Sequence, residues 1–555
     1  MSENWLRYAK VCLIVSMLVS LIGAAGCGSA ATPTRTVVPT VVPQKTATSL
    51  PTGPVSGGEL VFGYTESAAS FDPPAEEVRI TARVMINVCE PLVVRGPDRN
   101  FQPALAESWT VSPDGKTYTF ALRKGVKFHD GTPFNAEAVK FNLDRVANPE
   151  NKLLAIDLLG AYEATEVVDD YTVRVRLKEP LAPMLDSLSQ VYMCMVSPTA
   201  VKKWGASFGE HVVGTGPFMV EEIVTQSYVK LVKNPDYNWA PAFFKHQGPA
   251  YLDRITFKFI PEETTRLATL ETGETSMVDY LGPEGVKALQ GNPKFYMGRA
   301  PYGGMPRCVW LNTQVWPTDN LAVRRALSYA VNKQEVVDTL FKGINDPATA
   351  PLTKSTFGYN PGVNLYPFSQ AKVDEVMVAD GWKLNAKGIW EKDGKPIHLV
   401  YVNLGGYGLD ELAQMVQGQL IKAGFDVEII TQALSPWMAT VGEGKTHNLV
   451  PTMSDATDPT VLRGSFSEAT IDTMGNRSKV RGNAELETLL LQQDSESDPA
   501  KREQLVKQIQ VIIMDQAYVV PMYDVSEVYG ISAKVQDVSF EPATHPLLYD
   551  AWIKP

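Results

Sequence analysis

Apolar residues recur along residues 58–555 at two spacings, the two-residue spacing of strands and the three-to-four-residue spacing of helices. Tyr118, Phe120 and Leu122 alternate with polar residues, which predicts a half-buried strand. Residues 173–177 repeat this alternation after the turn pair Asp169-Asp170, which predicts a hairpin over residues 167–177. These segments predict a small unit that mixes strands and helices.

Three later segments have helical spacing. The segment 321–333 carries an apolar stripe behind Asp319 and Asn320, both candidates for the N-cap. Residues 412–420 form a second stripe, which Gly424 ends before an alternating strand at residues 427–429. Asp498-Pro499 places a capping residue before proline and so starts a third helix. Such alternation of helices and strands predicts α/β lobes with covered sheets.

The N-terminus reads as a targeting segment. Residues 11–25 are almost entirely apolar and follow Arg7 and Lys10, but the run is short for a membrane span and typical of a signal-peptide core. It ends in Ala24-Ala25-Gly26-Cys27, which resembles a bacterial lipobox, so we expect lipidation of Cys27. An ordinary secretory signal with an incidental cysteine remains the alternative. Residues 28–57 are rich in Thr, Pro, Ser and Val, which predicts a disordered tether.

Net charge and cysteine content bear on the partners of the protein and on its disulfide bonds. The net charge is −11 and no basic stretch occurs, so we expect no nucleic-acid partner. No second apolar run approaches the length of about 18 residues that a membrane span needs. Cys12 belongs to the signal segment and Cys27 is the expected lipidation site, so three cysteines remain: Cys89, Cys194 and Cys308. The sequence leaves two alternatives open, one disulfide or three buried free thiols.

Four motifs carry a family resemblance. They are PALAESWTVSPDGKTYTFALRKGVKFHDGTPFNAEAVKFNLDR at 103–145, GTGPF at 214–218, NPDYNW at 234–239 and WLNT at 310–313. Together they resemble the family 5 extracellular solute-binding proteins, the peptide- and nickel-type receptors of bacterial ABC importers. The resemblance spans roughly residues 57–555.

The resemblance implies a type II periplasmic-binding-protein fold, with two α/β lobes around a ligand cleft. We expect lobe 1 over residues 58–303 and 520–555, with an inserted subdomain at about 85–210, and lobe 2 over residues 304–519. The chain then crosses between the lobes near residues 302–307 and 517–523. Residues 1–27 are the expected signal peptide, with Cys27 retained.

The same resemblance points to a ligand-binding carboxylate. Residues 454–459, SDATDP, match the pattern in which peptide-binding members hold the ligand's α-amino group, and Asp455 takes the place of that carboxylate. A carboxylate–ammonium contact is directional and suits the reading of a free N-terminus. The alternative is a loop in which Asp455 and Asp458 cap the next helix.

Four other residues are candidates for ligand contact. The resemblance places Trp437 where the family often has Trp beside the cleft, and Tyr302 lies at an expected crossover. Both rings are candidates for stacking on a ligand, although each also suits a core or hinge position. Met453 stands just upstream of Asp455, where peptide binders usually have Trp, and Asn403 opens a segment, residues 403–407, that lacks the arginine of dipeptide binders. An unpaired ligand carboxylate is costly to bury, so this lack argues against a strict dipeptide ligand and leaves longer peptides, other amines and sugars open.

We therefore expect a monomeric, lipid-anchored receptor outside the cytoplasm, which delivers a peptide-like solute to an ABC permease and its ATPase and catalyses no reaction. We expect no cofactor, and no metal because the six histidines are scattered. A ligand sensor without transport is one alternative. The other is a hydrolase built on residues 205–209, GASFG, which match the G-x-S-x-G pattern of a nucleophile elbow.

Overall fold

The computed structural model describes residues 53–555 except residues 67, 77 and 406–407. The described residues form one compact unit. Cys27, the apolar segment before it and residues 28–52 of the expected tether lie outside the described residues. Among the helices that the structure describes, none combines the length and the apolar character needed to cross a membrane.

The first sheet organises lobe 1, which we define as the elements of this sheet and of the inserted unit described below. In spatial order, its described strands are β12 (Phe295–Pro301), β22 (Ser526–Ser532), β11 (Met277–Val278), β1 (Glu59–Tyr64), β10 (Arg254–Phe259), β9 (Tyr228–Lys233) and β8 (Phe218–Val224). Parallel pairing joins β1 to β10 and β11, while β12 pairs antiparallel with β22.

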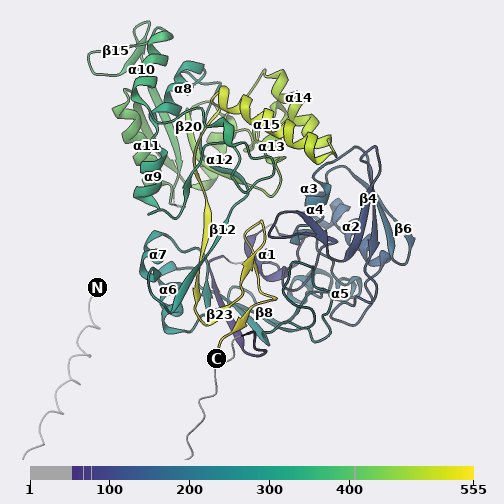
Figure 1. Ribbon diagram of the computed structural model, residues 1–555. Helices are drawn as coiled ribbons and strands as arrows, with labels where there is room; N and C mark the ends of the chain where they lie inside the picture. The colour runs from purple at the N-terminus through teal and green to yellow at the C-terminus, as the bar shows by residue number, and fades with distance from the viewer. Residues whose placement is uncertain (1–52, 67, 77, 406–407) are drawn as a thin grey trace, which may run out of the picture. The chain divides into compact units, whose positions relative to one another are not determined.

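The second sheet organises lobe 2. Its described strands, in spatial order, are β14 (Asp346–Pro347), β21 (Val519–Asp524), β13 (Gly304–Leu311), β20 (Leu449–Asp455), β18 (His398–Leu404) and β19 (Asp426–Gln432). Figure 1 shows the helices gathered around this sheet. They are α8 (Leu321–Ala330), α9 (Lys333–Leu340), α10 (Gln370–Ala379), α11 (Asp410–Lys422), α12 (Leu434–Glu443), α13 (Val461–Phe466), α14 (Ala484–Ser495) and α15 (Pro499–Asp515).

An inserted unit interrupts lobe 1. Its sheet has the order β4 (Ala106–Val111), β5 (Thr117–Leu122), β7 (Thr172–Leu177) and β6 (Tyr162–Asp169). The helices of lobe 1, inserted unit included, are α1 (Arg79–Met85), α2 (Ala136–Ala147), α3 (Ile156–Leu159), α4 (Met184–Ser187), α5 (Pro198–Trp204), α6 (Glu263–Thr272) and α7 (Pro283–Leu289).

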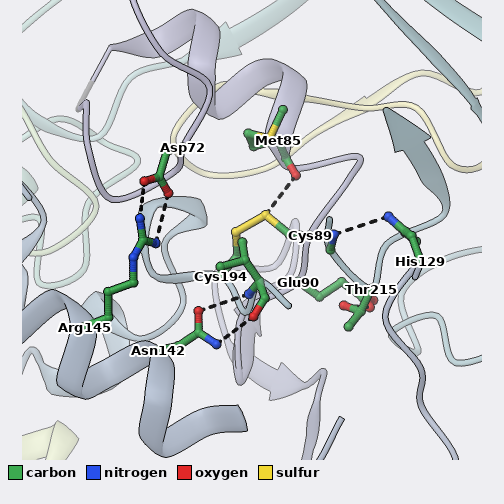
Figure 2. The surroundings of a disulfide bond; sticks show 11 residues. Asp72, Met85, Cys89, Glu90, His129, Asn142, Arg145, Cys194 and Thr215 are labelled. Carbon is green, nitrogen blue, oxygen red and sulfur yellow. Dashed lines mark hydrogen bonds and ion pairs between the residues drawn. A yellow bond between two sulfur atoms is a disulfide. The ribbon is translucent and has the colours of Figure 1, made fainter. Parts of the chain in front are cut away.

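A disulfide between Cys89 and Cys194 closes the inserted unit at its base (Figure 2). The Cys89 Sγ lies 3.5 Å from the carbonyl oxygen of Met85 in α1. Cys308 stays a free, buried thiol. Of the two arrangements that the sequence left open, the structure therefore contains the single disulfide.

Local sequence explains most of these elements. The side chains of Asn135, Asn320 and Asp498 accept backbone N–H groups at the starts of α2, α8 and α15, which confirms the caps predicted at Asn320 and Asp498. Gly424 follows the last residues of α11 with φ +93°, a conformation that glycine adopts without strain. The alternating residues of β5 and β7 are buried on one face, as predicted.

The chain crosses between the two sheets twice. The first crossover, Tyr302-Gly303, joins β12 to β13, and the second, Val525, joins β21 to β22. The second lies just beyond the expected 517–523, because β21 pairs with β13 and so keeps residues 520–524 in lobe 2. The Tyr302 N–H donates to the Val525 carbonyl oxygen at 3.0 Å, so the crossovers run side by side.

Candidate functional site

A cavity of about 650 Å³ lies where the two lobes meet. Lobe 1 contributes Arg79 from α1 and Asp186 from α4, and lobe 2 contributes Asp455 at the end of β20 and Asp494 near the end of α14. The crossover residue Tyr302 lines the same cavity. The structure thus brings two of the predicted ligand residues, Asp455 and Tyr302, into one cavity.

Asp455 faces a cation from the other lobe. Its side chain is 52% exposed, and its Oδ2 lies 3.0 Å from Nη1 of Arg79. The side chain of Thr460, the N-cap residue of α13, makes no capping hydrogen bond, whereas Oδ1 of Asp458 accepts the Thr460 N–H at 2.9 Å. Among the described residues, the hydrogen bond that Asp455 accepts comes from Arg79 rather than from the start of this helix. The capping alternative for Asp455 therefore finds no support in the geometry, whereas an ionic role does.

Arg79 also contacts Ala543, Thr544 and Tyr302. Its Nη2 donates to the Ala543 carbonyl oxygen at 2.9 Å and to the Thr544 hydroxyl. Its guanidinium lies 4.5 Å from the centre of the Tyr302 ring, a cation–π distance. Burial opposes the charge, but Tyr302 and Glu527 outweigh it and raise the pKa of Arg79 above its ordinary value. Arg79 therefore remains a fixed cation beside the cavity.

Tyr302 makes its side-chain contacts within the protein. It is 8% exposed, its hydroxyl donates to Oε2 of Glu527 at 3.0 Å, and Arg79 occupies its ring face. In this arrangement the ring orients a protein cation, and the hydroxyl ties the first crossover to β22. Stacking on a ligand remains a prediction for Tyr302.

A buried network of ion pairs lies next to Arg79 and centres on Arg83. Arg83, one helical turn after Arg79, contacts both Asp279 and Glu527, and all three side chains are fully buried. Burial raises the pKa of Asp279 to about 6, although Arg83 and Arg266 work in the opposite direction. Removing one partner from such a buried pair leaves an uncompensated charge and is destabilising. The network therefore holds α1, the helix that carries both Arg83 and Arg79, in place.

A second set of contacts bridges the lobes. The Thr457 hydroxyl donates to Oδ2 of Asp186 at 2.7 Å, and Asp186 also pairs with Arg95 at 2.8 Å. Asp458 forms a two-pronged pair with Arg502, at 2.6 and 2.9 Å. Asp458 is therefore a structural residue of lobe 2, and Thr457 joins it to lobe 1.

Three predicted residues do not line the cavity. Trp437 is 4% exposed and packs against Val402, Val441 and Val450, because its side of α12 faces the sheet. Asn403 is fully buried in β18, and its Nδ2 donates to Asp410 at 2.6 Å. Met453 is half-buried in β20, two residues before Asp455. Trp437 and Asn403 are core residues in this structure.

The hydrolase motif lacks its geometry. Ser207 is exposed on a 3-10 helix, Gly205–Glu210, which follows helix α5 rather than a strand. A nucleophile elbow needs a strand before the serine and a helix after it. Among the described residues, no group of three or more His, Cys, Asp or Glu side chains is placed to hold a metal ion.

Sequence reasoning missed Arg79, a cation that lines the cavity and pairs with Asp455. The segment 403–407 indeed holds no arginine, and Gly406 and Tyr407 lie outside the described residues. A usable signal was present, since Arg79 and Arg83 stand four positions apart within a run, residues 78–88, whose other members are apolar except for Thr81 and Asn87. Charges inside an apolar helix are rare unless they are paired.

Residues 100–469 match the family described as bacterial extracellular solute-binding proteins, family 5 Middle. A curated relative, the glutathione-binding protein GsiB of Salmonella choleraesuis, is 35% identical over 324 residues, which cover 58% of this chain and 62% of that protein. The match thus spans less than two thirds of that relative's length.

Two solved structures resemble the fold. NikA from Brucella suis, in complex with Fe(III)-EDTA, is 26% identical with a TM-score of 0.77, covering 88% of this chain and 98% of NikA. DppA from Helicobacter pylori, in complex with the peptide STSA, is 25% identical with a TM-score of 0.70, covering 90% and 99%. The architecture described above is therefore the type II periplasmic-binding-protein fold.

Proposed function

Because the chain belongs to the family 5 bacterial extracellular solute-binding proteins, we propose that it is the substrate-binding component of an ABC importer. It captures a peptide-like solute between its lobes and delivers it to a membrane permease whose ATPase supplies the energy. The observation that carries this proposal is the interlobe cavity of about 650 Å³ with Asp455 at its edge. The relatives named for glutathione and peptide binding support the solute class.

The mechanism is closure about the paired crossovers. Tyr302-Gly303 and Val525 are the points at which the chain passes between the sheets, and they are hydrogen-bonded to each other. A solute shifts the balance toward the closed form only by as much as it binds that form better than the open one. Contacts to both lobes provide this difference, and no covalent chemistry is required.

Asp455 is the proposed partner of the solute's ammonium group. The change Asp455→Asn keeps the shape and removes the charge, so peptide affinity should fall about 30- to 4,000-fold, equivalent to about 2–5 kcal/mol. The unliganded protein should lose little stability, because the pair with Arg79 is partly exposed and such pairs contribute about 0–1 kcal/mol.

The test combines ligand identification with calorimetry. Mass spectrometry of solute co-purified with the gently isolated protein names the ligand, and titration of that ligand compares the wild type with Asp455→Asn. Equal affinities would remove Asp455 from recognition. Recovery of a solute with no amine would contradict the peptide-like class.

We also propose that Cys27 anchors the protein to the outer face of the plasma membrane. The Cys27→Ala variant should release the body into the medium or leave the precursor uncleaved, as cell fractionation and N-terminal mass analysis would show. Unchanged membrane retention of a correctly cleaved variant would contradict lipidation. A ligand sensor without transport remains a second candidate, and neighbouring permease and ATPase genes would favour transport.

A further inference from the structure

A short segment of the inserted unit is hydrogen-bonded to lobe 2 without involving the crossovers. Residues 178–183 lead from β7 into α4, and the Ala182 N–H donates to the Asp494 carbonyl oxygen of α14 at 2.7 Å. Asp186 of α4 accepts the Thr457 hydroxyl of lobe 2, also at 2.7 Å. Figure 1 shows α14 of lobe 2 above α3 and α4 of the inserted unit. We call Ala182, Asp186, Thr457 and Asp494 the latch residues.

The acceptor in lobe 2 is a group that its own helix leaves unpaired. Asp494 is the last residue but one of α14, and the last four carbonyl groups of a helix have no partner within it. The Asp494 carboxylate is held within lobe 2 by Arg463 at 2.9 Å and by the Thr460 hydroxyl. The carbonyl oxygen is therefore fixed in position, and its donor comes from the other lobe.

The donor segment is fixed within the inserted unit. The Tyr118 hydroxyl of β5 donates to the Leu181 carbonyl oxygen at 3.0 Å, and the Tyr118 side chain is buried. Pro180 and Pro183 flank Leu181-Ala182, and each proline restricts its own φ and the conformation of the residue before it. A segment restricted in this way loses little conformational entropy when it contacts lobe 2.

A row of alternating charges crosses between the lobes beside these hydrogen bonds. Arg95, which ends β2 (Val93–Arg95), lies 2.8 Å from Asp186 and 3.8 Å from Asp458 of lobe 2. Asp458 in turn pairs with Arg502 at 2.6 Å. Separation of the lobes would part Arg95 from Asp458, but Arg95 would keep Asp186 and Asp458 would keep Arg502. Opening therefore leaves no charge of this row without a partner.

We propose that the inserted unit is a latch on lobe 2, which holds the two lobes together for part of the time without a solute. All contacts of the latch join protein groups, so they form whether or not a solute is bound. Each of these groups can bond to water when the lobes separate, so the net stabilisation is modest and the latch is reversible. This inference goes beyond the proposed function, because it assigns a task to the inserted unit and its test needs no solute.

The latch changes how much a solute must contribute to closure. A solute shifts the lobes only through its preference for the closed form. Because the latch already favours that form, a smaller preference is enough to populate it. Asp186, Thr457 and Asp494 also line the interlobe cavity, so the latch lies at the wall of the space that closure encloses.

Amide hydrogen exchange of the full-length protein, followed by mass spectrometry after dialysis to remove co-purified solute, tests the latch. The Ala182 amide is the reporter, because its acceptor belongs to the other lobe and the flanking Pro180 and Pro183 carry no N–H. In the wild type this amide should exchange at least about tenfold more slowly than an unprotected amide. The amides of β7 bond to β5 and β6 and report the stability of the inserted unit itself.

Three variants isolate the hydroxyl that joins the lobes. Thr457→Val keeps the shape and removes the bond to Asp186, so the protection of the Ala182 amide should fall about two- to tenfold while the β7 amides stay unchanged. Thr457→Ser keeps the hydroxyl and should keep the protection. Thr470→Val is the matched control, since Thr470 lines the same cavity but its hydroxyl donates within lobe 2, to the Ser467 carbonyl oxygen at 2.8 Å. It should also keep the protection.

Each outcome supports or overturns the latch. Exchange of the wild-type Ala182 amide at the unprotected rate overturns it, and so does unchanged protection in Thr457→Val. Equal loss of protection at Ala182 and in β7 would show that the variant loosens the inserted unit as a whole, which also contradicts the latch. Should Thr457→Val fail to fold, Thr457→Ala removes the same hydroxyl and takes its place. The proposed function stands in all these cases, because it fails only if the gently isolated protein binds no solute.

Discussion

Removal of the Cys89–Cys194 disulfide should destabilise the protein by several kcal/mol. The bond joins residues 105 positions apart, and the enclosed loop contains the whole four-stranded sheet of the inserted unit. Chain-entropy arguments assign about 4.7 kcal/mol to a loop of roughly 100 residues, and measured values for native disulfides run from about 2 to 5 kcal/mol. We therefore expect the double variant Cys89→Ala/Cys194→Ala to lose about 2–5 kcal/mol.

Urea unfolding followed by tryptophan fluorescence measures this loss. The slope of the free energy against urea should rise in the double variant, because an unfolded chain without the cross-link exposes more surface. A reducing agent should shift the midpoint of the wild type and leave that of the double variant unchanged. Cys308→Ala is the matched control, since this buried thiol closes no loop and should leave the slope unaltered.

The reasoning fails if the double variant unfolds within about 1 kcal/mol of the wild type under non-reducing conditions. Peptide binding gives a second check, because neither cysteine lines the interlobe cavity. Affinity should therefore survive in the double variant wherever it remains folded. Loss of affinity without loss of stability would show that the disulfide shapes the site rather than the unfolded state.

Two further predictions concern a buried acid and a glycine beside the crossover. Burial raises the pKa of Glu90 from 4.5 to about 7. The folded state therefore favours the protonated acid, whose contribution to stability is full below about pH 4.5 and is lost as the pH rises through 7, by up to about 3 kcal/mol. Glu90→Gln should flatten this part of the plot of melting temperature against pH, and an unchanged plot would contradict the prediction. Gly304 has φ +85°, and an added Cβ would lie 2.5 Å from backbone atoms of Ser454 and Ala456. Gly304→Ala should therefore lower the free energy of unfolding, measured in urea, by at least about 1–3 kcal/mol. Gly464→Ala is the control and should lower it little, because Gly464 has an ordinary φ and open space around its Cβ position.

Local interactions made much of the fold predictable. Asn320 caps α8 because its side-chain oxygen accepts two backbone N–H groups that the helix leaves unpaired, and this depends only on neighbours in sequence. The strand at Tyr118, Phe120 and Leu122 follows from a period of two. Capping and alternation depend on residues within about a dozen positions of each other, so contacts between distant parts of the chain were not needed to predict these elements.

Pairings across the chain were not predictable in the same way. The three cysteines Cys89, Cys194 and Cys308 allow several arrangements, and only the fold shows that Cys194 reaches Cys89. The direction of the Trp437 side chain was not predictable for a related reason. The family resemblance placed Trp437 beside the cleft, but the side of α12 that carries it packs on β18 and β20. A motif fixes the position of a residue along the chain, and packing fixes the direction of its side chain.

The contacts at the site explain why recognition and lobe movement belong together in the proposed function. Tyr302 lies in the first crossover, holds Arg79 on its ring and donates to Glu527, which stands in β22 just after the second crossover. Rotation about the crossovers therefore moves Arg79 relative to Asp455. A solute that contacts both lobes gains part of its contacts only when the lobes approach, which gives it a higher affinity for the closed form. A solute that pairs with one lobe binds open and closed forms alike and cannot shift their populations.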